Sequence, residues 1–266
     1  MKMPKIGLGT FRLKEQVVID SVLNGLELGY RHIDTAQIYG NEAEVGRAIK
    51  ESGIPRSELY ITTKIWTSNF SGNKLLTSLQ ESLEKLQIER LDMTLIHWPS
   101  PKDEVPVAEY MTALAKAQDQ GLTQEIGVSN FTIAHLRQAI AAVGAGRITN
   151  QQIEIHPFLQ NKRVVAFCQE NQIPVTAYMP LAYGKVMHDP VLQKIASKHA
   201  TTPALISLAW LLQQGFTVIP SSTKREHLAN NLKAADITLS DEEMSAIARL
   251  DINERIANPD FSPNWD

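Results

Sequence analysis

The chain contains only one cysteine, Cys168, among its 266 residues. A lone cysteine excludes an internal disulfide and any zinc cluster built from several thiolates. Its neighbours Val164, Val165 and Phe167 indicate a partly buried thiol on a helix, which fits a structural role better than a catalytic one.

Long apolar runs and clusters of basic residues are also missing. The sequence contains no stretch of about 18 apolar residues, which is the length that a membrane-spanning helix needs. Residues 1–11 contain neither an apolar segment nor a cleavage site of small residues. Lysine and arginine are scattered and the formal net charge is -3, which argues against nucleic-acid or anionic-membrane partners. We expect a soluble, cytoplasmic protein that binds neither nucleic acid nor membranes.

Two signatures of cofactor sites do not occur either. Gly7 and Gly9 continue into FRLKE, without the third glycine of the G-x-G-x-x-G dinucleotide fingerprint. His32, His97 and His156 do not have the spacing of metal ligands, so we expect no metal centre, and a metal hydrolase is disfavoured.

Short β-rich runs alternate with helical patterns along the chain, which is typical of βα units and a parallel sheet. Eight such units fit a closed barrel better than an open sheet, whose two edges would need cover. We therefore predict an α/β protein of the (β/α)8 TIM-barrel class, with a single domain formed by residues 1–266. The predicted strands are residues 5–9, 30–34, 59–64, 93–97, 125–129, 150–154, 174–178 and 216–220.

The C-terminal part contains more helix than eight units need. The interval between the last two strands is long enough for an additional helical segment, with a break at Pro203. A helix is predicted at about residues 224–233, and an extra C-terminal helix begins after Ser240, where Glu243 completes a capping-box spacing. The tail from Asp251 onward is loop-like.

The predicted strand ends carry many polar side chains. In a barrel of this class the C-terminal ends of the strands form the active-site face. Asp34 ends the second strand with Tyr39 in the loop beyond it, Lys64 ends the third strand, and His97 ends the fourth. Each alone has an ordinary structural explanation, but their combination on three adjacent strands favours one shared site. The other ends carry Ser129, Asn130, Gln152, Glu154, Tyr178, Ser221, Ser222 and Thr223.

Four of these side chains could act together as a proton donor. A phenol has a pKa near 10, so Tyr39 is a weak acid at neutral pH unless its anion is stabilised. Lys64 would lower that cost, and Asp34 would keep the lysine charged and aimed. Tyr39 could then protonate an oxygen on which charge develops, while His97 donates a hydrogen bond to the same oxygen. The arrangement suits carbonyl reduction and lacks only a source of hydride.

A Schiff-base lyase with Lys64 as nucleophile would use the same residues differently. That chemistry needs a lysine with a lowered pKa, whereas Asp34 would keep Lys64 protonated. The residues therefore favour reduction. Trp66 and Trp98, just after the third and fourth strands, would supply apolar walls for a substrate.

Over nearly its whole length the sequence resembles the aldo-keto reductase superfamily, and within it the bacterial 2,5-diketo-D-gluconate reductases, particularly the B type. The resemblance implies Asp34, Tyr39, Lys64 and His97 as a catalytic tetrad, with Tyr39 as general acid and NADPH as hydride donor. The matching motifs are GLGTF (7–11), YRHIDTAQIYGNE (30–42), ITTKIW (61–66), LIHWPSP (95–101), IGVSNF (126–131), NQQIEIHP (150–157) and VIPSSTKREHLANN (218–231).

The resemblance also implies a cofactor site. Ser129, Asn130 and Gln152 would hold the nicotinamide carboxamide, and Tyr178 would stack on the nicotinamide ring. Residues 219–231 would take the adenosine end, in keeping with the phosphate sites that barrels build after their last two strands. The implied cofactor residues are Thr10, Phe11, Asp34, Ser129, Asn130, Gln152, Tyr178, Leu181, Ile219, Ser221, Ser222, Thr223, Arg225, Asn230 and Asn231.

Departures from the family pattern bear on the choice of cofactor. Ser221 and His227 stand where many relatives have a lysine and an arginine that grip the 2′-phosphate. Lys224 and Arg225 could replace them, and a flat guanidinium suits phosphate and adenine together. We predict a preference for NADPH over NADH, with Arg225 as its determinant.

The loops after the fourth and seventh strands and the C-terminal tail, which shape the substrate pocket in this family, are short in this chain. A shallow pocket would suit small polar carbonyls such as keto-sugar acids, methylglyoxal-like dicarbonyls and small aldehydes. Trp265 could fold over the mouth of the pocket or pack at the terminus. The family implies a monomer. An alternative function is a non-catalytic, NADPH-binding redox-sensing subunit, which the intact tetrad disfavours.

Overall fold

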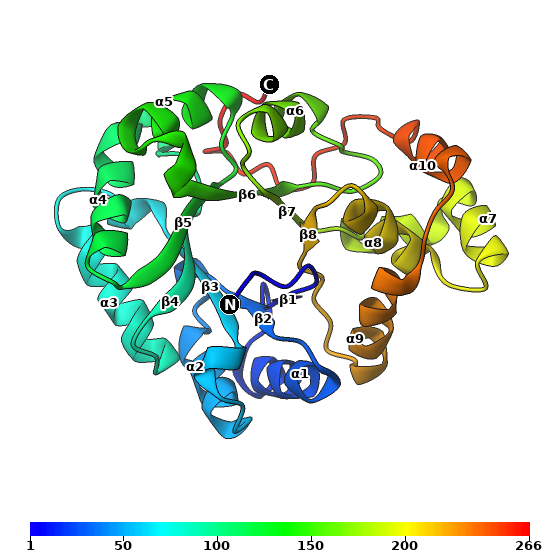
Figure 1. Cartoon of the computed structure of the whole chain (residues 1–266), viewed down its shortest axis with the longest axis horizontal. Helices are drawn as coiled ribbons and strands as arrows, with labels where there is room; N and C mark the ends of the chain where they lie inside the picture. Colours follow the sequence, from blue (N-terminus) through cyan, green and yellow to red (C-terminus); the bar gives the residue numbers. More distant parts are fainter.

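The computed structural model describes residues 1–266 and contains a barrel of eight parallel strands (Figure 1). Each strand pairs with the next one along the chain. Between the last strand and the first, Ile6 bridges Val218 and Gly7 N–H donates to Val218 O at 2.8 Å. The strands are β1 (Leu8–Gly9), β2 (His32–Asp34), β3 (Tyr60–Ile65), β4 (Leu91–Ile96), β5 (Thr123–Ser129), β6 (Ile148–Glu154), β7 (Val175–Tyr178) and β8 (Thr217–Val218). All eight predicted strands are confirmed, although β1, β2, β7 and β8 are shorter than predicted.

Helices surround the barrel (Figure 1). The additional helical segment predicted before the last strand is confirmed, because both α7 and α8 lie between β7 and β8 and Pro203 is the first residue of α8. The capping box is also confirmed: Ser240 Oγ accepts from Glu243 N–H, and the Glu243 side chain accepts from Ser240 N–H. The helices are α1 (Glu15–Leu28), α2 (Glu42–Glu51), α3 (Lys74–Leu86), α4 (Val107–Asp119), α5 (Ile133–Val143), α6 (Lys162–Glu170), α7 (Pro190–Lys198), α8 (Pro203–Gln213), α9 (Arg225–Leu232) and α10 (Asp241–Ala248).

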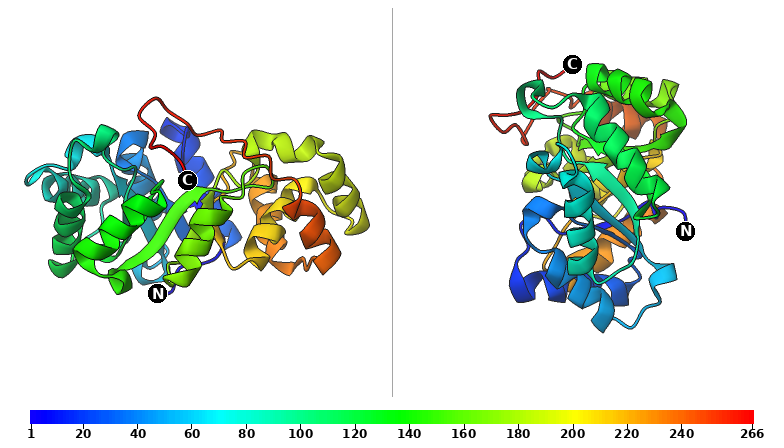
Figure 2. Two further views of the ribbon diagram at one scale, coloured as in Figure 1. Left: turned by 90° about the horizontal axis from the view of Figure 1, so that it is seen from above. Right: turned by 90° about the vertical axis from the view of Figure 1, so that its left-hand side faces the viewer.

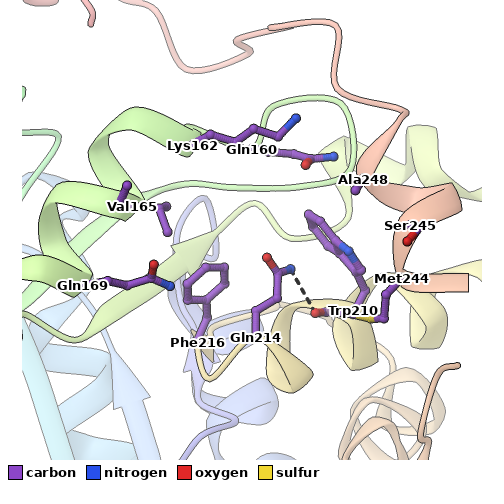
Figure 3. Close-up of a pocket in the computed structure, with 11 residues that line it drawn as sticks. Gln160, Lys162, Val165, Gln169, Trp210, Gln214, Phe216, Met244, Ser245 and Ala248 are labelled. Carbon is purple, nitrogen blue, oxygen red and sulfur yellow. Dashed lines mark hydrogen bonds between the residues drawn. The ribbon is translucent and has the colours of Figure 1, made fainter. Parts of the chain in front are cut away.

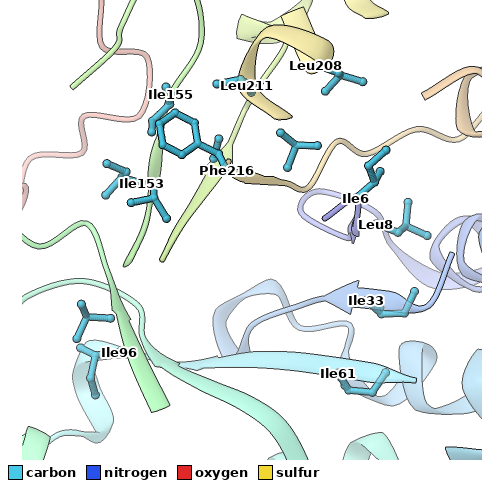
Figure 4. Packing of buried hydrophobic residues seen from close by; sticks show 14 of the residues in the cluster. Ile6, Leu8, Ile33, Ile61, Ile96, Ile153, Ile155, Leu208, Leu211 and Phe216 are labelled. Atoms are coloured by element: carbon cyan, nitrogen blue, oxygen red, sulfur yellow. The ribbon is translucent and has the colours of Figure 1, made fainter. Parts of the chain in front are cut away.

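The alternation of side chains along the strands separates the apolar core from the barrel interior. Ile33 on β2 and Ile61 on β3 belong to the buried core that packs beneath the helices (Figure 4). The side chains of successive strand residues point to opposite faces. Asp34 is one residue after Ile33 and Lys64 is three residues after Ile61, so each lies on the opposite face of its strand from that isoleucine. Both side chains therefore point into the barrel.

The two ends of the barrel are distinct. The N-terminus lies at one end, and the C-terminal tail, residues 251–266, runs across the other (Figure 2). The tail contains no helix or strand, as the sequence predicts. Within the barrel, Met3 packs against an interior cluster of Tyr60, Met93 and Leu95.

The thiol of Cys168 is buried on α6. Burial raises the pKa of this thiol to about 12, so it stays protonated and unreactive at neutral pH. The structural role predicted for it is consistent with this burial. None of the helices has both the length and the apolar character that crossing a membrane requires.

Gly46 in the middle of α2 marks a close approach to the end of α3. A Cβ placed there would lie 2.6 Å from the backbone O of Lys85 and of Leu86. On helix propensity alone, Gly46→Ala should stabilise the protein by up to about 1 kcal/mol. We expect the opposite sign, a loss of about 1–3 kcal/mol, because backbone atoms cannot rotate out of the way. Denaturant unfolding measures this change in the free energy of unfolding. Gly146→Ala is the control, since a Cβ at Gly146 would meet nothing within 4 Å. A stabilised Gly46→Ala protein would contradict the close packing.

Candidate active site

An ion pair lies inside the barrel where β2 and β3 end. Lys64 Nζ is 2.5 Å from Asp34 Oδ1, and the two side chains are 1% and 2% exposed. The same ammonium donates to Thr35 O at 3.0 Å and to Tyr39 Oη at 3.3 Å. The structure thus brings together Asp34, Lys64 and Tyr39.

The charges around Lys64 determine its protonation state. Burial alone would lower the pKa of Lys64, but the Asp34 carboxylate and Tyr39 outweigh burial and raise it. A lysine with a raised pKa remains an ammonium at neutral pH and cannot attack a carbonyl as a free amine. This geometry disfavours the Schiff-base alternative.

The pKa of Tyr39 does not shift in the direction that the neighbouring Lys64 alone would produce. Burial raises the pKa of Tyr39, and the lowering effect of Lys64 offsets only part of that rise. The net direction is upward, so the phenol stays protonated across the neutral range. Lys64 therefore reduces the cost of forming the phenolate without making the phenolate the resting state.

His97 lies directly after β4 and beside the phenol. Its ring packs edge-on against Tyr39, with centroids 5.7 Å apart, and against Trp66, at 5.3 Å. Burial, with a smaller contribution from the Lys64 cation, holds the pKa of His97 well below its usual value, so the ring is neutral. Nδ1 is buried without a partner. A neutral imidazole has a single N–H, so the ring can donate one hydrogen bond.

The loop that carries Tyr39 is fixed by a residue that the sequence pattern did not identify. Asn41 is buried, and its Nδ2 donates to Thr10 O at 2.9 Å and to Leu13 O at 3.0 Å. Its Oδ1 accepts from Thr35 Oγ1 at 2.8 Å. These bonds tie the loop after β1 to the loop after β2. In the sequence Asn41 appears only as one residue of the motif at 30–42.

The four residues assigned to the nicotinamide form one hydrogen-bonded group beside the ion pair. Ser129 Oγ donates to Gln152 O at 2.8 Å, Asn130 Nδ2 donates to Ser129 Oγ at 3.2 Å, and Tyr178 Oη donates to Asn130 Oδ1 at 2.7 Å. Gln152 Nε2 donates to Asp34 Oδ2 at 2.8 Å, which connects the group to the ion pair. A hydroxyl and two amides can both donate to and accept from a carboxamide, so these side chains fit a nicotinamide.

The aromatic walls include one residue that the sequence analysis missed. Phe261 of the tail packs edge-on against Trp66 and Trp98, with centroids 5.7 Å and 5.5 Å apart. Trp265 lies beside Trp98 at 6.0 Å, so it belongs to the same aromatic cluster. The tail has no periodicity, and nothing in its sequence indicated which ring would reach the barrel.

The residues assigned to the adenosine end lie in the loop after β8 and on α9, next to α1. Ser21 on α1 donates to Ser222 O at 2.7 Å. Arg225 Nη1 is 2.7 Å from Glu27 Oε2 and 2.8 Å from Asn24 Oδ1, so its guanidinium is held over α1. The remaining residues of this set are Ile219, Ser221, Thr223, Asn230 and Asn231, with Asn231 buried at 4% exposure.

The loops after β1 and β7 face each other across the same end of the barrel. Phe11 is 45% exposed and its ring lies 5.1 Å from that of Tyr39. The Arg12 guanidinium sits between Phe11 and Tyr183, at 5.1 Å and 4.9 Å from their ring centroids. Thr10 Oγ1 donates to Asp34 O at 3.0 Å, and Leu181 precedes Tyr183 in its loop. An exposed aromatic and cationic surface of this kind can accommodate a flat, anionic dinucleotide.

A separate hollow of about 430 Å³ lies outside the barrel, among α6, α8 and α10 (Figure 3). Trp210 and Phe216 line it together with Lys162 and Met244. None of Asp34, Tyr39, Lys64 or His97 lines this hollow, so the candidate chemistry lies at the strand ends.

Comparison with known proteins gives a consistent result. A model of the aldo/keto reductase family matches residues 5–252. The methylglyoxal reductase DkgB of Escherichia coli O157:H7 is 58% identical over 267 residues, covering 100% of both chains. A crystal structure of a protein assigned as a 2,5-diketo-D-gluconic acid reductase B superposes with a TM-score of 0.96 at 39% identity, covering 99% of this chain and 94% of that one. The aldose reductase of Schistosoma japonicum gives a TM-score of 0.90 at 33% identity, covering 96% and 91%.

Removing one partner of the buried ion pair should destabilise the protein far more than removing one partner of an exposed pair. We expect Lys64→Met to lower the free energy of unfolding by about 3–5 kcal/mol, because Asp34 is left as a buried charge without its cation. The double variant Asp34→Asn/Lys64→Met should regain a large part of that loss in a double-mutant cycle. Urea unfolding measures each value.

Arg47→Met is the matched control, since the Arg47–Glu51 pair has a comparable distance of 2.6 Å but lies in solvent. Its effect should be small. Equal losses for Lys64→Met and Arg47→Met would contradict the importance of burial.

Proposed function

Because this chain belongs to the aldo/keto reductase family, we propose that it reduces small aldehydes, ketones and dicarbonyls to alcohols with NADPH as hydride donor. The observation that carries the proposal is Lys64, which contacts both Asp34 and the Tyr39 hydroxyl inside the barrel.

In the proposed reaction, some residues bind the cofactor and another transfers the proton. Ser129, Asn130 and Gln152 would hold the carboxamide of NADPH, and Tyr178 would support its ring. When bound there, the cofactor would supply the hydride that the carbonyl carbon receives. Tyr39 transfers the proton of Oη to the carbonyl oxygen as negative charge develops there, so the product is an alcohol.

Lys64 and His97 assist that proton transfer in different ways. The Lys64 ammonium stabilises the phenolate that Tyr39 becomes, and Asp34 keeps the ammonium in place. Neutral His97 donates a hydrogen bond to the substrate oxygen and orients it. The raised pKa of Tyr39 keeps the acid loaded with its proton at neutral pH, which is the state that reduction requires.

The proposed substrate class rests on the relatives and on the aromatic walls. The relatives include methylglyoxal reductases and a protein assigned as a 2,5-diketo-D-gluconic acid reductase. Trp66, Trp98 and Phe261 surround the space beside His97 with apolar rings. Activated carbonyls of the methylglyoxal or 2,5-diketo-D-gluconate type need little binding energy from distant contacts.

Tyr39→Phe tests the role of the acid. We expect the rate of NADPH oxidation with methylglyoxal or 2,5-diketo-D-gluconate to fall by about 10²–10⁴-fold, because no other group can protonate the oxygen efficiently. Binding of NADPH, followed by quenching of tryptophan fluorescence, should be retained. Tyr110→Phe on α4 removes a phenol outside the barrel and should leave the rate unchanged.

Two outcomes would count against this proposal. If Tyr39→Phe retains most of the wild-type rate, Tyr39 is not the acid. If the wild type binds NADPH but a wide panel of carbonyls fails to oxidise it, the non-catalytic subunit becomes the better description.

Arg225→Ala tests the preference for NADPH. Charge-assisted hydrogen bonds from a guanidinium to a phosphate are strong, so we expect KM for NADPH to rise about tenfold while KM for NADH changes less than twofold. Lys224→Ala removes the other candidate cation, and its effect on KM for NADPH should be smaller if Arg225 is the determinant. Arg225 is paired with Glu27, so Glu27→Gln should free the guanidinium and lower KM for NADPH. An unchanged ratio of the two KM values in Arg225→Ala would remove the assignment.

A further inference from the structure

Glu154 is a buried carboxylate at the mouth of the barrel that the proposed reaction does not use. It is the last residue of β6 and is 0% exposed. It lies two residues beyond Gln152, so both side chains project from the same face of the strand. In the sheet, Glu154 is paired with Tyr178 of β7.

The hydrogen-bond partners of this carboxylate come mainly from the C-terminal tail. Oε1 accepts from Ile256 N–H and Oε2 accepts from Ala257 N–H, both at 2.8 Å. His156 Nε2 lies 2.9 Å from Oε1 and must donate, since a carboxylate only accepts. A buried charge is tolerated only where such donors surround it, and two of the three belong to the backbone of the tail.

The neighbouring tail residues are connected to the same point. Asn161 Nδ2 donates to the backbone O of Glu154 at 2.7 Å, and Arg255 Nη2 donates to Asn161 Oδ1 at 2.9 Å. The guanidinium of Arg255 also stacks on Trp265, 3.6 Å from the ring centroid. The other ionic contacts of the tail are partly solvent-exposed, as in the pair formed by Lys162 and Asp251. Glu154 is therefore the fully buried charge to which the tail is attached.

Phe261 follows Ala257 by four residues and meets Trp66 and Trp98 on the opposite side of the mouth. Without a helix or strand in the tail, the position of this ring depends on where the preceding backbone is held. We propose that Glu154 is a positioning residue for the substrate site, because it fixes the tail so that Phe261 forms the third aromatic wall. This inference rests on the proposed function, since the pocket it shapes is that of the carbonyl substrate.

Glu154→Gln tests the inference with two measurements. The glutamine keeps the size of the side chain but presents an NH2 group to one of the tail N–H donors, so one bond is lost and a donor faces a donor. Trypsin should cleave after Arg255 about tenfold faster than in the wild type, as measured by intact mass. KM for methylglyoxal should rise about tenfold, while kcat stays within about twofold because the tetrad is untouched.

Three further variants separate positioning from general damage. Glu170→Gln makes the same chemical change at an exposed site on α6 and should alter neither measurement. Phe261→Ala should raise KM to the same extent. The double variant Glu154→Gln/Phe261→Ala should be no worse than either single variant, because both changes remove the same wall. Should Glu154→Gln fail to fold, Ala257→Pro deletes one donor from the side of the tail and should show the same two effects.

Several results would overturn the inference. Unchanged cleavage after Arg255 would show that Glu154 does not hold the tail, and faster cleavage with unchanged KM would show that the tail does not shape the pocket. Additive effects in the double variant would also contradict it. A wild type that reduces no carbonyl overturns the proposed function and the substrate part of this inference, whereas faster cleavage in Glu154→Gln would still support the attachment of the tail.

Discussion

The ion pair between Asp34 and Lys64 is the constraint on which the rest of the site depends. Two buried charges are tolerated only if each finds partners, because their removal from water is costly. Asp34 has Lys64 on one oxygen and Gln152 on the other, and Lys64 also contacts Thr35 O and Tyr39 Oη. These contacts come from β2, β3 and β6, so only a closed barrel can supply them. A slip of β3 by one residue would turn Lys64 toward the apolar layer under the helices.

The sequence could predict the features that arise from local patterns. Eight strands, the break at Pro203 and the capping box of Ser240 with Glu243 follow from periodicity, backbone chemistry and short spacing. The rule that active sites lie at the C-terminal ends of barrel strands then placed Asp34, Lys64 and His97 on one face. The net pKa direction of Tyr39 did not follow, since it depends on how completely the folded chain excludes water from the phenol.

Contacts between distant segments without periodicity could not be predicted. Ile256 and Glu154 are 102 residues apart, and the pairing of Arg225 with Glu27 spans 198 residues. Asn41 differs only in degree: its partners Thr10 and Leu13 are 31 and 28 residues away and lie in an irregular loop. In each case an isolated polar residue is compatible with many structures, and the surrounding fold decides which donor or acceptor it meets.

The strand β6 connects the chemistry of the site with its selectivity. Because side chains alternate along a strand, residues 152 and 154 face the same side, and the first bonds Asp34 while the second bonds the tail. The ion pair is thus built from strand ends and the acid lies in a loop fixed by Asn41, whereas one aromatic wall comes from a segment held by backbone N–H groups. Substitutions in the tail can then change the shape of the pocket without disturbing Asp34, Lys64 or Tyr39. In the proposed reaction, such a division would allow one reduction mechanism to serve different carbonyl substrates, because the groups that move the proton and those that enclose the substrate belong to separate parts of the chain.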